Sequence, residues 1–324
     1  MRLIFLGTPA FAVPTLHAIV KAGHEVAAVL TQPDRPRGRG QNAAASPVKQ
    51  AALALGLTVH QPERVRRPEA VEYLRGMASD AMVVVGFGQI IPQVVIDLAP
   101  LGIINVHASL LPRYRGAGPI QWAIVRGETR TGVTTMRINA GLDTGDMLLK
   151  AETEIGPEEN AVELGARLAA MGAELLVETL EGLLEGRIVP QKQDDSQATL
   201  APLLKKEDGA IDWTATAQAI HNRVRGLQPW PGAQTSFRGA PLHLWKSRVG
   251  SPGGADALVR ARPPGRALRA PGRFVGMKPL VVACGDGILE LLEVQLEGRK
   301  RISAADFANG QRLTDNDVLG ELPI

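Results

Sequence analysis

Two polar residues at the end of an apolar run, Asn105 and His107, are the first candidates for chemistry in this sequence. They belong to a short run that begins at Ile103, whose composition predicts a buried strand. Because successive side chains of a strand point to opposite faces, those of Asn105 and His107 point to the same face. An isolated pair of this kind is more often structural than catalytic, so the next question is which third group lies near it.

A glycine-flanked acidic turn, Gly141–Asp146, supplies the third group. Its Asp143 is able to bring a carboxylate to the imidazole of His107. Together the three groups suit acyl transfer, because Asn105 and a charged His107 stabilise negative charge on a carbonyl oxygen while Asp143 holds the imidazole charged. No serine or cysteine nucleophile is evident, which favours direct attack by a substrate amine over a covalent enzyme intermediate.

The elements that position these residues alternate between strand and helix in the first half of the chain. A helical pattern covers about Phe11–Lys21 and another covers Ala161–Leu184. The short apolar runs between such patterns are Leu3–Leu6, Glu25–Thr31, Ala81–Gly86 and Ile103–Val106. They predict a parallel sheet covered on both faces. Ligands of such sheets bind at the carboxyl ends of the strands, which is where residues 105–112 fall.

Several common functions lack their patterns here. The first strand ends without the glycine spacing of a dinucleotide-binding turn, and no Gly-Lys-Ser/Thr phosphate loop is present. The six histidines and the single cysteine, Cys284, show no zinc-like spacing, so we expect no metal. The lone cysteine agrees with a reducing compartment. No apolar run reaches about 18 residues, and Pro9 and Pro14 argue against a signal peptide, so we expect a cytoplasmic protein.

A change in composition predicts a second domain. The polar run Gln191–Gln197 indicates a linker, after which a helix over about Ala217–Leu227 precedes short strand-like runs separated by Gly and Pro. We therefore expect a catalytic domain over 1–188, a linker over 189–204 and a small antiparallel β-barrel over 205–324. Residues 205–324 contain 17 Lys and Arg against 12 Asp and Glu. That modest excess fits a nucleic-acid partner or solubility alone.

The chain resembles the methionyl-tRNA formyltransferase family along nearly its whole length. Its most specific part is Asn105–Gln121, with an Asn-x-His-x-Ser-Leu-Leu-Pro core that other folate-dependent formyltransferases share, continued by Gly141–Met147. Further segments that carry the resemblance are Phe5–Pro9, Thr31–Pro36, Gly38–Gly40 and Ser46–Lys49. The loop Arg35–Lys49, together with Ile211–Trp213 and Pro229–Pro231, narrows it to the tRNA enzymes.

The resemblance implies an α/β fold in which a Rossmann-like formyltransferase domain is followed by a smaller OB-like β-barrel domain. It implies that a formyl group moves from 10-formyltetrahydrofolate to the α-amine of methionine on initiator tRNA, with no metal. Asn105, His107 and Asp143 would be the catalytic residues, and backbone around Phe87–Ile91 would line the pterin pocket. The residues that would border the folate site are Ser109, Leu110, Leu111 and Pro112.

The resemblance also implies contacts with tRNA. The basic segment Asp34–Lys49 matches a loop that the family wedges against the acceptor end, and Arg39 matches its important arginine. This chain departs from the family after Gly40, where Gln41, Asn42 and three alanines stand in place of frequent lysines, which bears on the total charge of the loop. Lys206 lies at the entrance of the second domain and is the other candidate tRNA contact.

Other functions remain open from the residues. The same three catalytic groups fit a folate-dependent formyltransferase that acts on a small amine, or a hydrolase in which water replaces the amine. A non-catalytic tRNA-binding protein is the alternative from a different class. We expect the protein to be a monomer.

Overall fold

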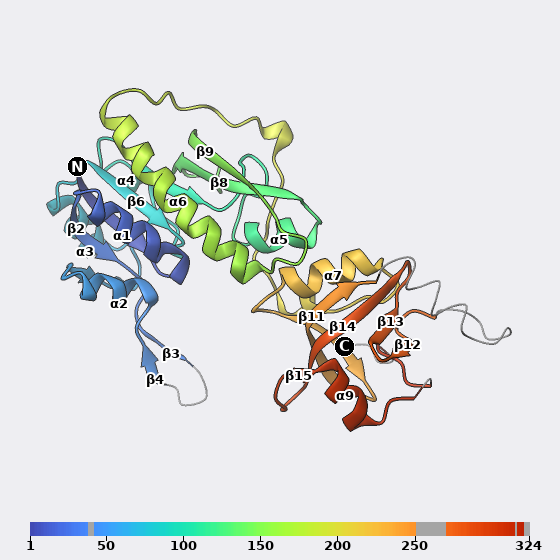
Figure 1. Cartoon of the computed structure of the whole chain (residues 1–324). Coiled ribbons are helices and arrows are strands. Elements are labelled where there is room, and N and C mark those ends of the chain that lie inside the picture. The colour runs from blue at the N-terminus through green and yellow to red at the C-terminus, as the bar shows by residue number, and fades with distance from the viewer. Residues whose placement is uncertain (38–41, 251–269, 315, 321–324) are drawn as a thin grey trace. The chain divides into compact units, whose positions relative to one another are not determined.

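The computed structural model describes residues 1–37, 42–250, 270–314 and 316–320, and the chain folds into two compact units (Figure 1). The first unit contains Met1–Pro119, Arg130–Glu154 and Gly165–Pro202. The second contains Ile120–Thr129, Ile155–Leu164 and the residues from 203 onward. Among the described residues, no helix has both the length and the apolar character needed to span a membrane.

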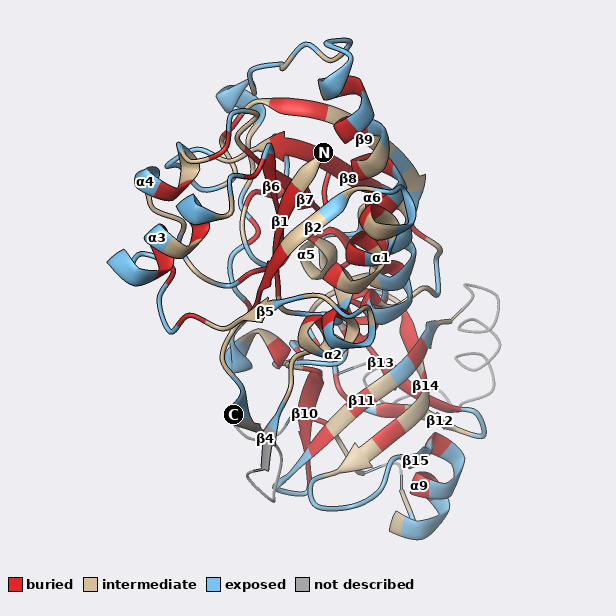
Figure 2. Cartoon of the chain, turned by 90° about the vertical axis from the view of Figure 1, so that its left-hand side faces the viewer, coloured by how far each residue is buried: buried red, intermediate tan, exposed pale blue. Residues whose placement is uncertain are grey.

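A seven-stranded sheet in the order β5-β2-β1-β6-β7-β8-β9 forms the centre of the first unit. The first five strands of this order, β5, β2, β1, β6 and β7, pair in parallel, which confirms the predicted α/β fold. Strand β8 pairs antiparallel with β7 on one side and with β9 on the other. Their bounds are β1 Arg2–Gly7, β2 Glu25–Leu30, β5 Val59–His60, β6 Ala81–Val85, β7 Ile103–His107, β8 Arg130–Arg137 and β9 Met147–Glu154. Figure 2 shows that β1, β6 and β7 consist mainly of buried residues.

Helices accompany this sheet, and proline sets the start of several of them. The predicted helix over Phe11–Lys21 is a 3-10 turn, η1 (Ala10–Ala12), followed by α1 (Val13–Lys21). Pro14 stands in the first turn of α1, where its missing N–H leaves no gap in the helix. The remaining α-helices up to residue 184 are α2 Pro47–Ala54, α3 Pro68–Gly76, α4 Gln93–Ile96, α5 Pro119–Val125 and α6 Ala161–Leu184. Of these, α5 belongs to the second unit from Ile120 onward.

Helix α6 has the bounds that the sequence predicts, and it packs against the strand that carries the candidate residues. Leucines and alanines at three- and four-residue spacing give α6 one apolar face, which includes Leu168 and Leu176. A Cβ on Gly172 would lie 2.6 Å from a Val106 methyl carbon and 3.2 Å from Val133. Only a glycine at this position lets the helix approach β7 and β8 this closely.

The register of the sheet brings three strand ends to one edge. Gly7 of β1 lies opposite Val85 of β6, and Val84 lies opposite Asn105 of β7. The segments that follow these strands therefore leave the sheet at the same edge, as expected for a ligand site in a fold of this kind.

The second unit is an antiparallel β domain, as predicted. Its strand order is β10-β11-β14-β13-β12, with β15 paired to β14. Val318 pairs with Arg273 beside β12 and Leu319 pairs with Phe237 of β10, so the last described segment joins the two edges of the sheet. The bounds are β10 Ala233–Phe237, β11 Ala240–Val249, β12 Phe274–Met277, β13 Leu280–Ala283, β14 Ile288–Leu296, β15 Ile302–Ser303, α7 Ala217–Gly226 and α9 Ala304–Gln311.

Candidate functional site

Asn105 and His107 lie on β7, which is flanked in the sheet by β6 and β8. Both are buried, with 8% of Asn105 and 6% of His107 exposed. No described residue hydrogen-bonds the side-chain amide of Asn105. Buried amides in proteins almost always have a partner, so this amide is available to a carbonyl oxygen that enters the site.

His107 is held from two sides. Its Nε2 lies 2.9 Å from the backbone carbonyl oxygen of Tyr114. Because a carbonyl only accepts, Nε2 carries a proton and donates it. Its Nδ1 lies 3.7 Å from Oδ2 of Asp143, an ion-pair distance when the ring is protonated. The structure thus brings together the three predicted catalytic residues and adds the Tyr114 carbonyl, for which a side-chain pattern gives no signal.

Asp143 reaches His107 from a turn with unusual backbone geometry. Its φ is 51°, in the left-handed region, where a residue with a Cβ costs on the order of 1 kcal/mol. Its Oδ2 accepts a hydrogen bond of 2.8 Å from the N–H of Gly116. A Cβ on the neighbouring Gly145 would lie 1.8 Å from the carbonyl oxygen of Arg137, so the turn needs a glycine there. The glycine-flanked pattern of the sequence reflects this geometry.

The predicted folate-border residues 109–112 form a tight turn after β7. The Ser109 hydroxyl donates to the carbonyl of Arg113 at 2.6 Å, and the Ser109 carbonyl accepts from the hydroxyl of Thr134 at 2.7 Å. Lys150 donates to the Leu111 carbonyl at 2.6 Å, and burial lowers the pKa of its ammonium. Ser109 and Leu111 are buried, whereas Leu110 and Pro112 are partly exposed. The turn is therefore held in place by hydrogen bonds to Arg113, Thr134 and Lys150.

The loop after β6 has a buried anchor and an open tip. The side-chain amide of Gln89 accepts from the N–H of Val65 and donates to the carbonyl of Pro62. Ile90, in contrast, is 93% exposed. Within the described residues, the N–H groups of Ile90 and Ile91 have no hydrogen-bond partner. An anchored loop that offers an apolar side chain and free backbone donors suits a planar ring with polar edges.

The segment predicted as a linker pairs with the loops around His107. Residues 191–202 belong to the first unit by their contacts. The N–H of Tyr114 donates to the hydroxyl of Thr199 at 2.9 Å, and Arg115 exchanges backbone hydrogen bonds with Thr199 and Ala201. A polar run without apolar periodicity gives no sign of these contacts, because they depend on main-chain groups that only folding brings together.

Of the two residues predicted to contact tRNA, only Lys206 is among the described residues. Arg39 lies outside the described residues. The segment around it forms the hairpin strands β3 (Arg35–Arg37) and β4 (Asn42–Ala44), where the sequence predicts a pliable loop. Lys49 of the same segment pairs with Asp34, and this hydrogen bond lowers the pKa of the Asp34 carboxyl. Lys206 is exposed, at the start of the 3-10 helix η3 (Lys206–Gly209).

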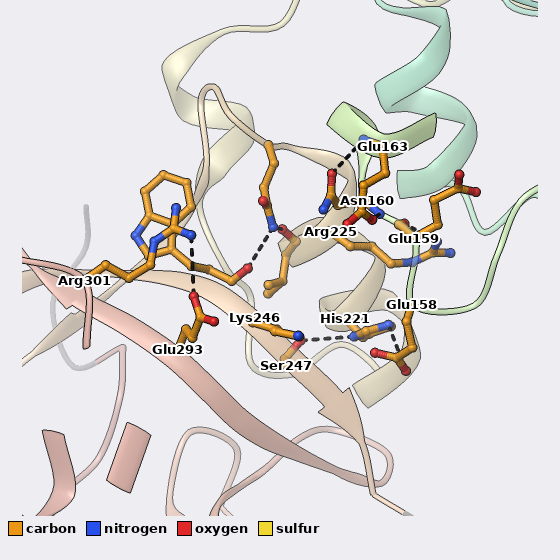
Figure 3. Close-up of a pocket in the computed structure, with 13 residues that line it drawn as sticks. Glu158, Glu159, Asn160, Glu163, His221, Arg225, Lys246, Ser247, Glu293 and Arg301 are labelled. Atoms are coloured by element: carbon orange, nitrogen blue, oxygen red, sulfur yellow. Dashed lines mark hydrogen bonds and ion pairs between the residues drawn. The ribbon is translucent and has the colours of Figure 1, made fainter. Parts of the chain in front are cut away.

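The second unit contains a polar pocket of about 440 Å³ that none of the three candidate catalytic residues lines (Figure 3). Its buried residues are His221, Val224 and Arg225 of α7 and Ser247 of β11. The His221 ring contacts the Ser247 hydroxyl at 3.1 Å and the Pro157 carbonyl at 3.2 Å. Arg225 donates to the carbonyls of residues 156 and 159 and to the amide oxygen of Asn222. Burial lowers the pKa of its guanidinium.

Comparison with known proteins identifies both units. The family model described as formyl transferase matches residues 1–180, and the one described as formyl transferase, C-terminal domain, matches residues 203–312. The methionyl-tRNA formyltransferase of Solibacter usitatus is 77% identical over 321 residues, which cover 99% of each chain. That of Koribacter versatilis is 55% identical, again over 99% of each chain.

A solved structure shows the same fold at low sequence identity. WlaRD, a sugar 3N-formyl transferase determined in the presence of dTDP and 5-N-formyl-THF, is 18% identical and superposes with a TM-score of 0.64. The match covers 93% of this chain and 99% of that one.

Proposed function

Because the chain belongs to the methionyl-tRNA formyltransferase family, we propose that it formylates the α-amino group of methionine on initiator tRNA through Asn105, His107 and Asp143. It is an enzyme of formyl transfer, and its donor is a formylated tetrahydrofolate, which supplies the formyl group when bound. The observation that carries the assignment of residues is the buried, unengaged amide of Asn105 on the same strand as a buried imidazole.

Asn105 and His107 act on the formyl oxygen in this proposal. The amide of Asn105 donates a hydrogen bond to it, and a protonated His107 places a positive charge nearby, so negative charge that develops on the oxygen is stabilised in a buried site. The Tyr114 carbonyl fixes the orientation of the ring through Nε2. Because the negative charge on the formyl oxygen grows only as the reaction proceeds, these interactions stabilise the transition state more than the bound substrate. They therefore raise kcat rather than affinity.

Asp143 has two tasks in the same scheme. Its carboxylate, 3.7 Å from Nδ1, orients the imidazole, and it accepts the proton of the attacking amine through water. The N–H of Gly116 fixes one of its oxygens, so the carboxylate keeps its direction while charge moves around it.

We place the folate donor at the edge of the sheet where the segments after β6 and β7 leave it. We assign the turn Ser109, Leu110, Leu111 and Pro112 to the border of its site and the backbone of residues 87–91 to its ring. The free N–H groups of Ile90 and Ile91 and the exposed Ile90 side chain support this assignment. The proposal requires no metal.

We assign tRNA contacts to Arg39 and Lys206. Lysine and arginine side chains bind phosphate oxygens without regard to base sequence, so these residues would contribute affinity rather than selectivity. The exposure of Lys206 agrees with such a role. We further propose a cytoplasmic monomer with a catalytic domain over 1–188 and a tRNA-binding domain over 205–324. The linker over 189–204 connects them, and its residues up to 202 pack on the first unit.

The direct test incubates the purified protein with 10-formyltetrahydrofolate and methionyl initiator tRNA and measures formyl-methionine after deacylation. Wild type should form the product, and His107→Ala should lower kcat by about 10³-fold. A folded wild-type protein that leaves the tRNA unformylated but formylates a small amine would refute the tRNA assignment. Equal kcat in wild type and His107→Ala would refute the site.

A further inference from the structure

Two loops that meet at His107 both have strained backbones. Tyr114, whose carbonyl accepts from His107, has a φ of 62°, and Asp143 has a φ of 51°. Non-glycine residues keep such angles only where their surroundings fix them, and they concentrate at functional sites. The question is therefore which residues hold these two loops in place.

Gln193 contacts both loops through one side chain. Its Nε2 donates to the backbone carbonyls of Asp143 and Gly145, each at 2.7 Å. Its Oε1 accepts from Nε of Arg115 at 3.0 Å. Both amide hydrogens and the carbonyl oxygen are thus used, and all three partners belong to the two loops that carry Tyr114 and Asp143.

Arg115 completes the connection. Its side chain is buried, and Nη2 donates to Asp195 at 2.7 Å, which pairs the buried charge. Its backbone N–H and carbonyl bond Thr199 and Ala201, and the Thr199 hydroxyl accepts from Tyr114. One short segment, residues 193–201, thereby restrains the backbone of both strained loops.

We propose that Gln193 is a positioning residue for formyl transfer, which holds the turn of Asp143 against the loop of Tyr114 and Arg115. The inference rests on the proposed function. Among the described residues, Gln193 hydrogen-bonds none of those assigned to folate or to tRNA. We therefore expect it to act on the geometry between Asp143 and His107 and not on substrate affinity. Small displacements of catalytic groups lower the rate of chemistry strongly.

Gln193→Glu is the sharpest substitution, because it keeps size and the acceptor toward Arg115 while it removes both donors and sets a carboxylate against two carbonyls. We expect kcat to fall by about 10- to 100-fold while KM for each substrate changes by less than about threefold. Gln193→Met, which also lacks the donors but adds no charge, should show the same pattern. Gln191→Glu is the matched control, since the same change at an exposed side chain of the same segment should leave kcat within about twofold.

A readout without substrates separates positioning from general damage. The N–H of Gly116 donates to the Asp143 carboxylate, so its amide proton resonance in glycine-labelled protein reports whether that carboxylate stays in place. Asp143→Ala identifies the resonance. We expect it to move in both Gln193 variants and to stay in Gln191→Glu.

A second readout asks whether Gln193 acts through Asp143. Adding Gln193→Met to Asp143→Asn should cost much less than it costs alone, because residues that act as one unit are not additive. Full additivity would overturn the proposal. So would an unmoved Gly116 resonance in a folded Gln193 variant, a kcat within twofold of wild type, or a loss confined to KM. If wild type forms no formyl-methionyl-tRNA, the proposed function fails, and the Gly116 resonance alone decides the role of Gln193.

Discussion

The neighbourhood of His107 in the first unit and the pocket around His221 in the second contain the same kinds of groups, but they differ in what remains unbonded. Each has a buried histidine near a carboxylate, at 3.7 Å for His107 with Asp143 and 3.9 Å for His221 with Glu158. In the pocket, both ring nitrogens of His221 have close partners, Ser247 and the carbonyl of Pro157. Around His107, the amide of Asn105 has none among the described residues.

This difference separates a structural polar cluster from a site for chemistry. A buried group whose hydrogen bonds are all made within the chain stabilises the fold, and it has no capacity left for a ligand. A group near the surface of a site with a free donor can instead give that donor to a substrate atom.

The largest expected effect comes from replacing one buried asparagine in each region by alanine. Asn105→Ala should lower kcat by about 10²- to 10³-fold and should leave the free energy of unfolding nearly unchanged, because no bond within the chain is lost. Asn222→Ala, next to the pocket, should leave kcat unchanged and cost about 1–3 kcal/mol, because its Oδ1 accepts from Gln218 and Arg225. Steady-state formylation and denaturant unfolding measure both. Swapped outcomes would invert the comparison.

The second prediction concerns the pocket histidine itself. His221→Ala should lower the free energy of unfolding by about 1–3 kcal/mol, since it leaves the buried Ser247 hydroxyl and the Pro157 carbonyl without their partner. Formylation kinetics of the folded variant should match wild type. A fall in kcat of the size expected for His107→Ala would show that the pocket takes part in the reaction, and our distinction between the two regions would be wrong.

The parts that sequence predicts well are those with local causes. The bounds of α6 follow from leucine and alanine spacing, and β7 follows from a short apolar run. Asn105 and His107 could be placed on one strand, and the glycines around Asp143 marked a turn. The pairing of Asp143 with His107 was a hypothesis from residue types, and the structure brings the two together.

The parts that sequence does not predict depend on main-chain partners. The Tyr114 carbonyl has no side-chain signature, and Gln193 lies in a polar run that resembles any linker. The antiparallel pairing of β8 with β7 and with β9 likewise depends on how the chain returns to the sheet rather than on the composition of these strands. Gln193 and Asp143 are separated by 50 positions in the sequence, and a local pattern carries no information about such a pair.

A smaller effect is expected at the rim of the pocket, where groups reach solvent. The guanidinium of Arg301 lies 4.1 Å from the ring of Trp245 and pairs loosely with Glu293 at 3.5 Å. Arg301→Ala should cost less than about 1 kcal/mol, because exposed cation–π contacts and ion pairs contribute little. Unfolding in low and high salt would measure it. A loss as large as that of His221→Ala would mean that rim and buried members contribute alike.

The smallest expected effect is a pH dependence of the unfolding free energy that arises from Asp317. Its carboxylate is mostly buried, whereas its partner Arg238 is half exposed. Hydrogen bonds from Arg238, with further ones from Thr314, lower the pKa of the Asp317 carboxyl from 3.8 to about 2. Since the folded protein holds the charged form, this stabilisation is complete above about pH 4. It is lost as the pH falls through the folded pKa of about 2, because below that pH the carboxyl is protonated in both states.

The difference in unfolding free energy between wild type and Asp317→Asn should therefore be largest near neutral pH and shrink between about pH 4 and pH 2. Its size should stay below about 1 kcal/mol, because solvent screens the exposed guanidinium. Arg238→Met should remove most of the same pH dependence, which makes it the matched partner variant. A difference that grows on acidification would contradict the direction of the shift. A difference of several kcal/mol would show that a half-exposed pair contributes as much as the buried hydrogen bonds of His221.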